Sequence, residues 1–300
     1  MSIPYTKKPI FSGIATALVT PFTRDGVDLD AFRALVDYQI RGHIHALVVL
    51  GTTGEASTLT DGERDALISA AVEEAAHRVP IIVGCGSNDT KKAVTYATRA
   101  QSLGADGVLV VTPYYNKGTD SGIVSHYLAI ADAAALPLIL YNVPSRTGVD
   151  LTLSQYERLS FHPNIVAVKE AKGDTKRLSD LVALERLCVY SGNDEELLPA
   201  LSLGTSGLIS VLSNLFPSET VGIYEDFVSG RLKEAAARFY RLRPLARLLF
   251  EDTNPAPIKC AMSLSGLVPP RLRLPMSEVS PLLRERLASA LSSLAGIERP

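Results

Sequence analysis

The chain has 300 residues, of which 46% are hydrophobic and 21% are charged, so it can bury a sizeable core. Its 30 Lys and Arg residues against 32 Asp and Glu residues give a formal net charge of −2. This composition excludes an intrinsically disordered chain, and it offers no basic excess to attract nucleic acid or an anionic membrane surface.

Short apolar runs rich in β-branched residues recur at an average spacing of ~28 residues. Runs that are almost continuously apolar are typical of strands buried on both faces of a parallel sheet. In chain order, the eight runs are 14–20, 46–51, 81–85, 107–111, 137–141, 165–169, 188–191 and 207–211.

Helix-like segments lie between these runs. Residues 30–42 carry an apolar stripe, residues 61–77 begin with a capping-box pattern, and residues 91–104 end at a glycine. Eight strands that alternate with helices predict a (β/α)8 TIM barrel in the α/β class. An open doubly wound sheet would also alternate, but the count of eight favours the barrel. The stretch from Gly84 also carries only the first two glycines of a dinucleotide-binding fingerprint.

The pattern changes after the eighth run. From Pro217 onward only helical patterning is present, including an apolar stripe formed by Leu283, Leu287, Leu291 and Leu294. We therefore expect two units, a catalytic barrel over residues 1–216 and a C-terminal helical segment over residues 217–300 that packs on the barrel.

Cysteine usage and hydropathy indicate a cytoplasmic protein. The three cysteines, Cys85, Cys188 and Cys260, are far apart and form neither a disulfide framework nor a metal-binding pair. No apolar segment near the N-terminus is long enough for a signal peptide, and the longest uncharged stretch, residues 197–218, is too polar to cross a membrane. The five histidines lack metal-ligand spacing, so we expect no metal site.

In barrels of this kind the active site lies at the carboxyl ends of the strands. Lys169 ends the sixth run, and strand alternation places it on one face with Ile165 and Ala167, which we expect to point inward. Burial lowers the pKa of a lysine, and the free amine can then form a Schiff base with a carbonyl substrate. The alternative is that Lys169 marks an exposed strand end.

Residues with complementary chemistry follow neighbouring runs. Tyr141 closes the fifth run, where a phenol can relay protons to a lysine adduct. Thr52 and Thr53 lie in a glycine-bracketed turn whose backbone N–H groups suit a carboxylate. Arg146 can hold a second carboxylate with its guanidinium group. Each also has a plain structural interpretation, as a strand-end tyrosine, an ordinary turn or a solvated arginine.

A set of motifs identifies a family. In chain order they are Gly51-Thr52-Thr53-Gly54-Glu55, Thr112-Pro113-Tyr114-Tyr115, Tyr141-Asn142-Val143-Pro144, Val168-Lys169-Glu170 and the stretch 204–210. With them, essentially the whole chain resembles the dihydrodipicolinate synthase / N-acetylneuraminate lyase family of pyruvate-dependent class I aldolases. The resemblance implies a barrel with a C-terminal helical segment and no cofactor beyond a covalent pyruvate Schiff base.

The resemblance also implies roles for individual residues. Lys169 is similar to the lysine that forms the Schiff base with pyruvate, and Tyr141 is similar to the general acid/base. Thr53 and the backbone near Thr52 match the positions that hold the pyruvate carboxylate, with Thr53 and Tyr141 in a proton relay. Tyr115 matches a tyrosine that reaches into a neighbouring subunit's site and completes that relay.

Two further positions and the assembly follow from the same resemblance. Gly192 and Ile209 match residues that line the pyruvate pocket, Ile209 through its carbonyl group. A tyrosine shared between sites needs at least a dimer, and the family is usually tetrameric, so we expect a homotetramer built as a dimer of dimers.

Arg146 indicates the branch of the family. The stretch Pro144-Ser145-Arg146-Thr147-Gly148 resembles the synthase branch, where this arginine binds the carboxylate of L-aspartate 4-semialdehyde. The implied reaction is the condensation of pyruvate with this aldehyde in the diaminopimelate/lysine pathway, catalysed by a lyase. Two alternatives stay open, an aldolase of the same family that acts on a sugar acid or other 2-keto acid, and a catalytically silent pyruvate-binding paralogue.

One departure concerns regulation. Members inhibited by lysine use an acidic residue and histidines in their effector site, whereas the matching positions here are Lys92, Asp61 and Arg64, with Tyr114 and Asn88 kept. Lys92 would place like charge against the ammonium group of a lysine ligand. We therefore expect weak or absent lysine feedback.

Overall fold

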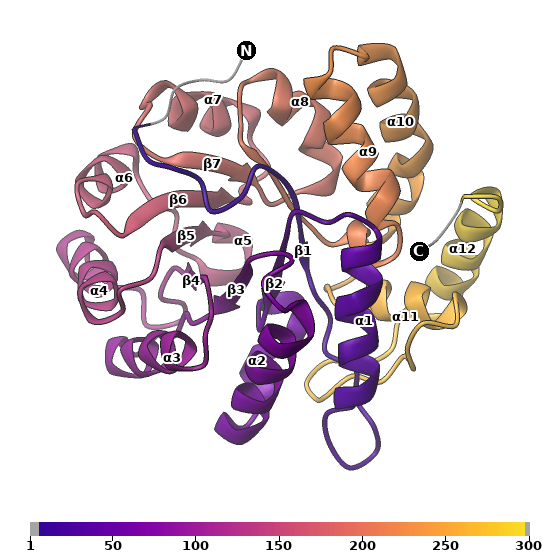
Figure 1. Ribbon diagram of the computed structural model, residues 1–300, viewed down its shortest axis with the longest axis horizontal. Coiled ribbons are helices and arrows are strands. Elements are labelled where there is room, and N and C mark those ends of the chain that lie inside the picture. Colours follow the sequence, from indigo (N-terminus) through magenta and orange to yellow (C-terminus); the bar gives the residue numbers. More distant parts are fainter. Residues whose placement is uncertain (1–5, 298–300) are drawn as a thin grey trace.

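The computed structural model describes residues 6–297; residues 1–5 and 298–300, at the outer ends of the two expected units, lie outside the described residues. Parallel strands close into a barrel in sequence order, with β1 pairing both β2 and β8 (Figure 1). The predicted TIM barrel is therefore confirmed. The strands are β1 (Gly13–Ala17), β2 (Ala46–Val49), β3 (Ile81–Gly84), β4 (Gly107–Val111), β5 (Leu138–Asn142), β6 (Ile165–Glu170), β7 (Cys188–Ser191) and β8 (Gly207–Ser210).

Helices surround the strands, and α10, α11 and α12 gather at one side (Figure 1). The capping box predicted at the start of residues 61–77 is present, with Thr60 and Glu63 bonded reciprocally. The helices of the first part of the chain are α1 (Leu29–Arg41), α2 (Asp61–Ala75), α3 (Thr90–Ser102), α4 (Asp120–Ala133), α5 (Pro144–Thr147), α6 (Leu153–Ser160), α7 (Thr175–Ala183) and α8 (Leu197–Ser202). Short 3-10 turns are η1 (Thr52–Gly54), η2 (Ala56–Thr58), η3 (Asp194–Glu196) and η4 (Leu212–Asn214).

The C-terminal part is helical, as expected, over its described residues 217–297. It contains α9 (Pro217–Val228), α10 (Leu232–Leu248), α11 (Ala256–Leu264) and α12 (Pro281–Ser293). The leucines of the predicted stripe are buried, namely Leu283, Leu287 and Leu291 on α12 and Leu294 at its C-terminal cap. Helix α9 contacts β1 and α8, and α10 packs on α9. The expected division of the chain at residues 216 and 217 stays a prediction.

The strand side chains form two separate apolar layers. One layer lies between strands and helices, and the other fills the barrel interior with residues such as Ile139, Ala167 and Tyr190. Between β5 and β6 the register skips one residue, because Leu138 pairs with Ile165 while Ile139 pairs with Ala167. This bulge reverses the alternation. Ala167 therefore belongs to the interior layer as predicted, whereas the expectation for Ile165 is wrong, since it packs in the outer layer.

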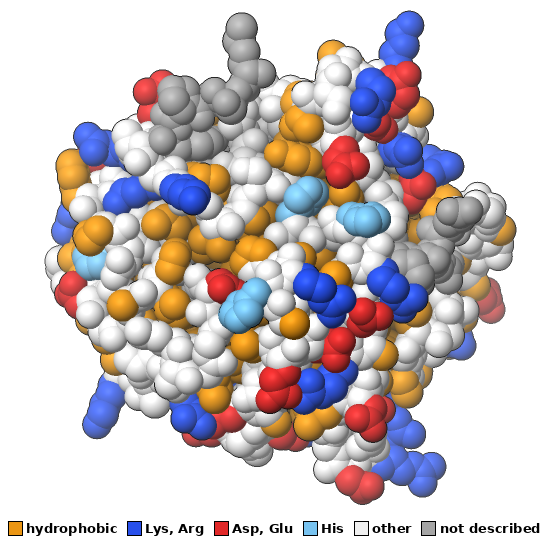
Figure 2. All heavy atoms as spheres, in the orientation of Figure 1, with side chains coloured by type: hydrophobic (Ala, Val, Ile, Leu, Met, Phe, Trp, Pro, Cys, Tyr) orange, Lys and Arg blue, Asp and Glu red, His pale blue; other side chains and the backbone are white. Residues whose placement is uncertain are grey.

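The amino end of the barrel is covered by the segment before β1, which crosses the barrel in Figure 1. Phe11 stacks on Tyr190 with ring centroids 4.3 Å apart, and the Tyr190 hydroxyl donates to the Phe11 carbonyl at 2.7 Å. On this face, Lys and Arg side chains are interspersed with Asp and Glu (Figure 2).

The structure bears on the predicted state of the cysteines and on the search for a membrane-spanning segment. Cys85, Cys188 and Cys260 are buried and free, as predicted. Within residues 6–297 there is no helix that combines the length and the apolar character needed to span a bilayer.

Candidate active site

A cavity of about 570 Å³ lies at the carboxyl ends of the strands. Its walls come from the turn after β2, the ends of β5 and β6, the loop after β7 and residues 250–254 of the C-terminal part. Phe11 closes the amino end of the barrel by stacking on Tyr190. The cavity opens the barrel interior at the opposite, carboxyl end. Barrel enzymes place their active sites here.

Lys169 lines this cavity from β6 and is only 6% exposed. Burial lowers the pKa of its amine to about 8, the nearby Arg146 charge also lowers it, and the Asp194 carboxylate opposes the shift. The exposed strand-end interpretation of Lys169 is therefore wrong. An amine with this pKa is partly unprotonated near neutral pH and can act as a nucleophile.

Tyr141 faces Lys169 from the neighbouring strand. The two residues are register partners on β5 and β6, and Lys169 Nζ lies 4.5 Å from the centroid of the Tyr141 ring. Burial raises the pKa of the Tyr141 phenol, while the Arg146 charge and a side-chain hydrogen bond with Thr52 lower it. Within this chain the hydrogen-bond partner of Tyr141 is Thr52 rather than the expected Thr53. The proton relay itself stays a prediction.

The Thr53 hydroxyl has a different partner. Asn254, from the segment between α10 and α11, donates its side-chain N–H to Thr53 Oγ1 at 2.9 Å. The backbone carbonyl of Asn254 accepts a hydrogen bond from the Arg146 guanidinium at 3.1 Å. Arg146 lies on α5 and lines the cavity. Asn254 therefore connects the turn after β2 with the arginine at the cavity mouth.

Gly192 lies in the cavity wall, at a position where there is no room for a side chain. A Cβ at this position would approach Ala171 Cβ to 2.6 Å and Lys169 Cε to 3.0 Å. Ile209, in contrast, is fully buried in the interior apolar layer and its side chain is not part of the cavity wall. The expectation for Ile209 concerned its carbonyl group, and that assignment stays a prediction.

Asp194 is a buried carboxylate at the start of η3. It accepts hydrogen bonds from the Ser210 hydroxyl and the backbone N–H groups of Val211 and Leu212. These bonds hold the end of β8 against the loop after β7. Its charge also acts on the amine of Lys169.

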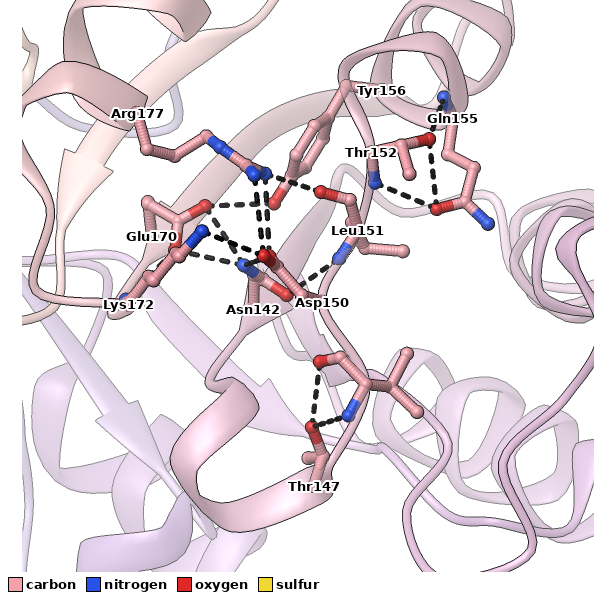
Figure 3. A network of polar contacts seen from close by, with 11 residues as sticks. Asn142, Thr147, Asp150, Leu151, Thr152, Gln155, Tyr156, Glu170, Lys172 and Arg177 are labelled. Carbon is pink, nitrogen blue, oxygen red and sulfur yellow. Dashed lines mark hydrogen bonds and ion pairs between the residues drawn. The ribbon is translucent and has the colours of Figure 1, made fainter.

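A second polar network lies behind the pair of strands that carries Tyr141 and Lys169 (Figure 3). Asn142, the residue after Tyr141, donates to both oxygens of Glu170, the residue after Lys169, at 3.0 and 3.1 Å. Tyr156 also donates to Glu170 at 3.0 Å. Because strand side chains alternate, these bonds fix the register of β5 on β6 from the face opposite the cavity.

Tyr115 is not part of the wall of the cavity that contains Lys169. It is 89% exposed and its backbone is in the left-handed region, with φ of 69°. A second cavity, of about 370 Å³, adjoins the first and is lined by Arg64, Lys92, Tyr96 and Tyr114. Among residues 6–297, no group of three or more His, Cys, Asp or Glu side chains is arranged to hold a metal ion.

The barrel, the cavity at the carboxyl strand ends and the buried amine together define a (β/α)8-barrel enzyme. The model of the Dihydrodipicolinate synthetase family matches residues 10–294. This chain belongs to that family.

Relatives and solved structures match this chain over nearly its full length. A 4-hydroxy-tetrahydrodipicolinate synthase of Clostridium perfringens is 43% identical over 272 residues, which cover 90% of this chain and 94% of that protein. A dihydrodipicolinate synthase from Acinetobacter baumannii, solved in complex with pyruvate, aligns with a TM-score of 0.93 at 41% identity over 97% of this chain and all of that one. A structure described as a monomeric dihydrodipicolinate synthase variant aligns with a TM-score of 0.93 at 39% identity over 99% and 100% of the two chains.

Proposed function

We propose that this chain is a 4-hydroxy-tetrahydrodipicolinate synthase, a lyase that condenses pyruvate with L-aspartate 4-semialdehyde in the diaminopimelate/lysine pathway. The observation that carries the proposal is the Lys169 amine, which is buried in a cavity and has its pKa lowered to about 8. The membership of the family and the names of the relatives support the same reaction.

The first half of the reaction needs a free amine and a proton relay. Lys169 attacks the C2 carbonyl of pyruvate, and the resulting carbinolamine loses water to give the Schiff base. Tyr141, with Thr52 as its hydrogen-bond partner, moves the protons that this step requires. The turn that carries Thr53 holds the pyruvate carboxylate. No cofactor is needed beyond this covalent intermediate.

The second half joins the two carbon chains. Loss of a proton from the pyruvate methyl group gives an enamine, whose carbon attacks the aldehyde carbon of the second substrate. Arg146, at the cavity mouth, binds the carboxylate of that substrate. The amino group of the semialdehyde then displaces the Lys169 nitrogen and closes the ring, so that pyruvate and semialdehyde give the cyclic product and one water.

We also propose a cytoplasmic homotetramer, a dimer of dimers, in which Tyr115 enters the site of a neighbouring subunit. The exposed and conformationally strained Tyr115 supports this assignment. The net charge of −2 gives no reason to add a nucleic-acid or membrane partner. Analytical ultracentrifugation of the wild type and of Tyr115→Ala tests the assembly, and a wild type that sediments as a monomer would contradict it.

A substrate comparison tests the reaction. Purified protein is supplied with pyruvate and either L-aspartate 4-semialdehyde or a polyhydroxylated sugar aldehyde, and pyruvate consumption is followed. We expect turnover with the semialdehyde and none in Lys169→Ala. Preferential use of the sugar aldehyde would support the sugar-acid aldolase instead, and pyruvate binding without turnover of either would indicate a silent paralogue.

A further inference from the structure

We propose that Asn254 is a positioning residue for the pyruvate carboxylate, because its side-chain N–H makes the Thr53 hydroxyl an acceptor and thereby directs the hydroxyl proton into the cavity. The inference rests on the proposed function, since it needs a carboxylate opposite Thr53. It assigns a role to the C-terminal part of the chain, which carries none of the site residues predicted from the sequence.

The structure places the side-chain nitrogen of Asn254, rather than its oxygen, toward the Thr53 hydroxyl. The nitrogen of a carboxamide can only donate, so Thr53 Oγ1 must accept in the 2.9 Å bond from Asn254. Asn254 is 5% exposed and lines the same cavity as Thr53. The other atom of the amide, Oδ1, is buried and has no hydrogen-bond partner among the described residues. Among the described residues, the only hydrogen bond of the Asn254 side chain is therefore the one that it donates to Thr53.

The hydroxyl proton of Thr53 is left for a ligand. A hydroxyl carries one proton, and within residues 6–297 Thr53 Oγ1 donates to no protein acceptor. The neighbouring Thr52 is already bonded to Tyr141. A carboxylate oxygen in the cavity is the acceptor that suits this proton, because hydrogen bonds to an ionised group are shorter and stronger than neutral ones.

Both partners of the Asn254–Thr53 contact are anchored. On one side, the Asn254 carbonyl accepts from Arg146. On the other, Glu55 ends the turn that contains Thr53 and forms an ion pair with Lys259 of α11, in which both side chains are buried. The ion pair connects α11 to the turn beside the Asn254 contact. It therefore holds the Asn254 amide and the Thr53 hydroxyl at a fixed position relative to each other.

A double-mutant cycle tests the proposal. The readout is the pyruvate concentration that gives half-maximal borohydride trapping on Lys169, measured for wild type, Asn254→Ala, Thr53→Val and the double variant. We expect Asn254→Ala to raise this concentration by on the order of tenfold, the effect of one hydrogen bond. In the Thr53→Val background, Asn254→Ala should add nothing further, because the hydroxyl through which it acts is absent. A full second increase in that background, or an unchanged Asn254→Ala, would overturn the proposal.

Two controls keep the outcome interpretable. Asn254→Asp has nearly the same shape but accepts the Thr53 proton and adds a negative charge, so it should weaken pyruvate binding more than Asn254→Ala does. Circular dichroism shows whether Asn254→Ala folds. If it does not, Asn254→Asp replaces it as the test variant, and tight pyruvate trapping by Asn254→Asp would contradict the proposal. A wild type that pyruvate does not trap would instead overturn the proposed function itself.

Discussion

Tyr141 and Lys169 are register partners on neighbouring strands, and the amine of Lys169 lies 4.5 Å from the centroid of the Tyr141 ring. This relationship depends on backbone pairing rather than on flexible loops. It is reinforced on the opposite face, where Asn142 and Glu170 are themselves paired. The reacting groups of the proposed mechanism are thus carried by paired strands, which position side chains more precisely than loops do.

The rate of pyruvate trapping should rise with pH and level off above a midpoint near 8. The nucleophile is the unprotonated amine, and a pKa of about 8 leaves about a tenth of it unprotonated at pH 7, against about 0.03% for an unshifted lysine. Initial trapping rates between about pH 6 and about pH 11 measure this profile, because that range includes both the expected midpoint and that of an ordinary lysine. A midpoint near 10 would mean that the amine is not desolvated.

Arg146→Met should have two separable effects. Removing the guanidinium abolishes a charge that lowers the pKa of Lys169, so the midpoint of the trapping profile should move to higher pH. Losing a charge-assisted pair of hydrogen bonds should raise the KM for the semialdehyde by about 10- to 100-fold. Arg146→Lys is the matched control, since it keeps the charge but loses the planar fork. An unchanged KM in Arg146→Met would remove Arg146 from the substrate site.

Gly192→Ala should impair Schiff-base formation although it adds a single methyl group. The new Cβ would meet Ala171 Cβ at 2.6 Å and Lys169 Cε at 3.0 Å, so the backbone or the lysine must shift. We expect at least a tenfold lower trapping rate with a fold that remains intact by circular dichroism. Gly62→Ala, at an open position where nothing lies within 4 Å of the added Cβ, is the control. Equal rates in the two variants would contradict the crowding argument.

L-Lysine should not inhibit this protein appreciably. The second cavity is lined by Arg64 and Lys92, and a hydrogen bond with Tyr96 raises the pKa of Lys92, which is therefore charged at neutral pH. A cationic ligand would face two like charges there. We expect less than a twofold change in initial rate at about 10 mM lysine. Lys92→Glu should gain sensitivity, and strong inhibition of the wild type would show that the charge argument fails.

Disrupting the network of Figure 3 should destabilise the barrel. Asn142 bonds to Glu170 and Asp150 and accepts from the backbone N–H of Leu151. Asn142→Ala therefore leaves that buried N–H without its partner and removes hydrogen bonds from both carboxylates. We expect the free energy of unfolding to fall by about 2–4 kcal/mol. Urea denaturation measures it, with the exposed Asn116→Ala as a reference that should change it far less. A loss below about 0.5 kcal/mol would mean that the network does not hold the strands.

The strands and the reactive lysine could be predicted from the sequence because both depend on local patterns. The apolar runs mark the strands. A lysine at the carboxyl end of such a run lies where barrel enzymes place their active sites. The bulge that turns Ile165 outward could not be predicted, since it arises from pairing between β5 and β6. Asn254 and Asp194 were missed for a similar reason. Asn254 meets Thr53 across 201 positions, and its neighbourhood carries no strand-end signal.

Borohydride reduction in the presence of pyruvate, followed by peptide mass spectrometry, tests the central claim most directly. Lys259 is a suitable internal comparison, because burial also lowers its pKa to about 8, yet its amine is paired with Glu55 and is not part of the cavity wall. We predict a single pyruvyl adduct, on Lys169. An adduct on Lys259 or on another lysine, or no adduct at all, would contradict the proposed mechanism.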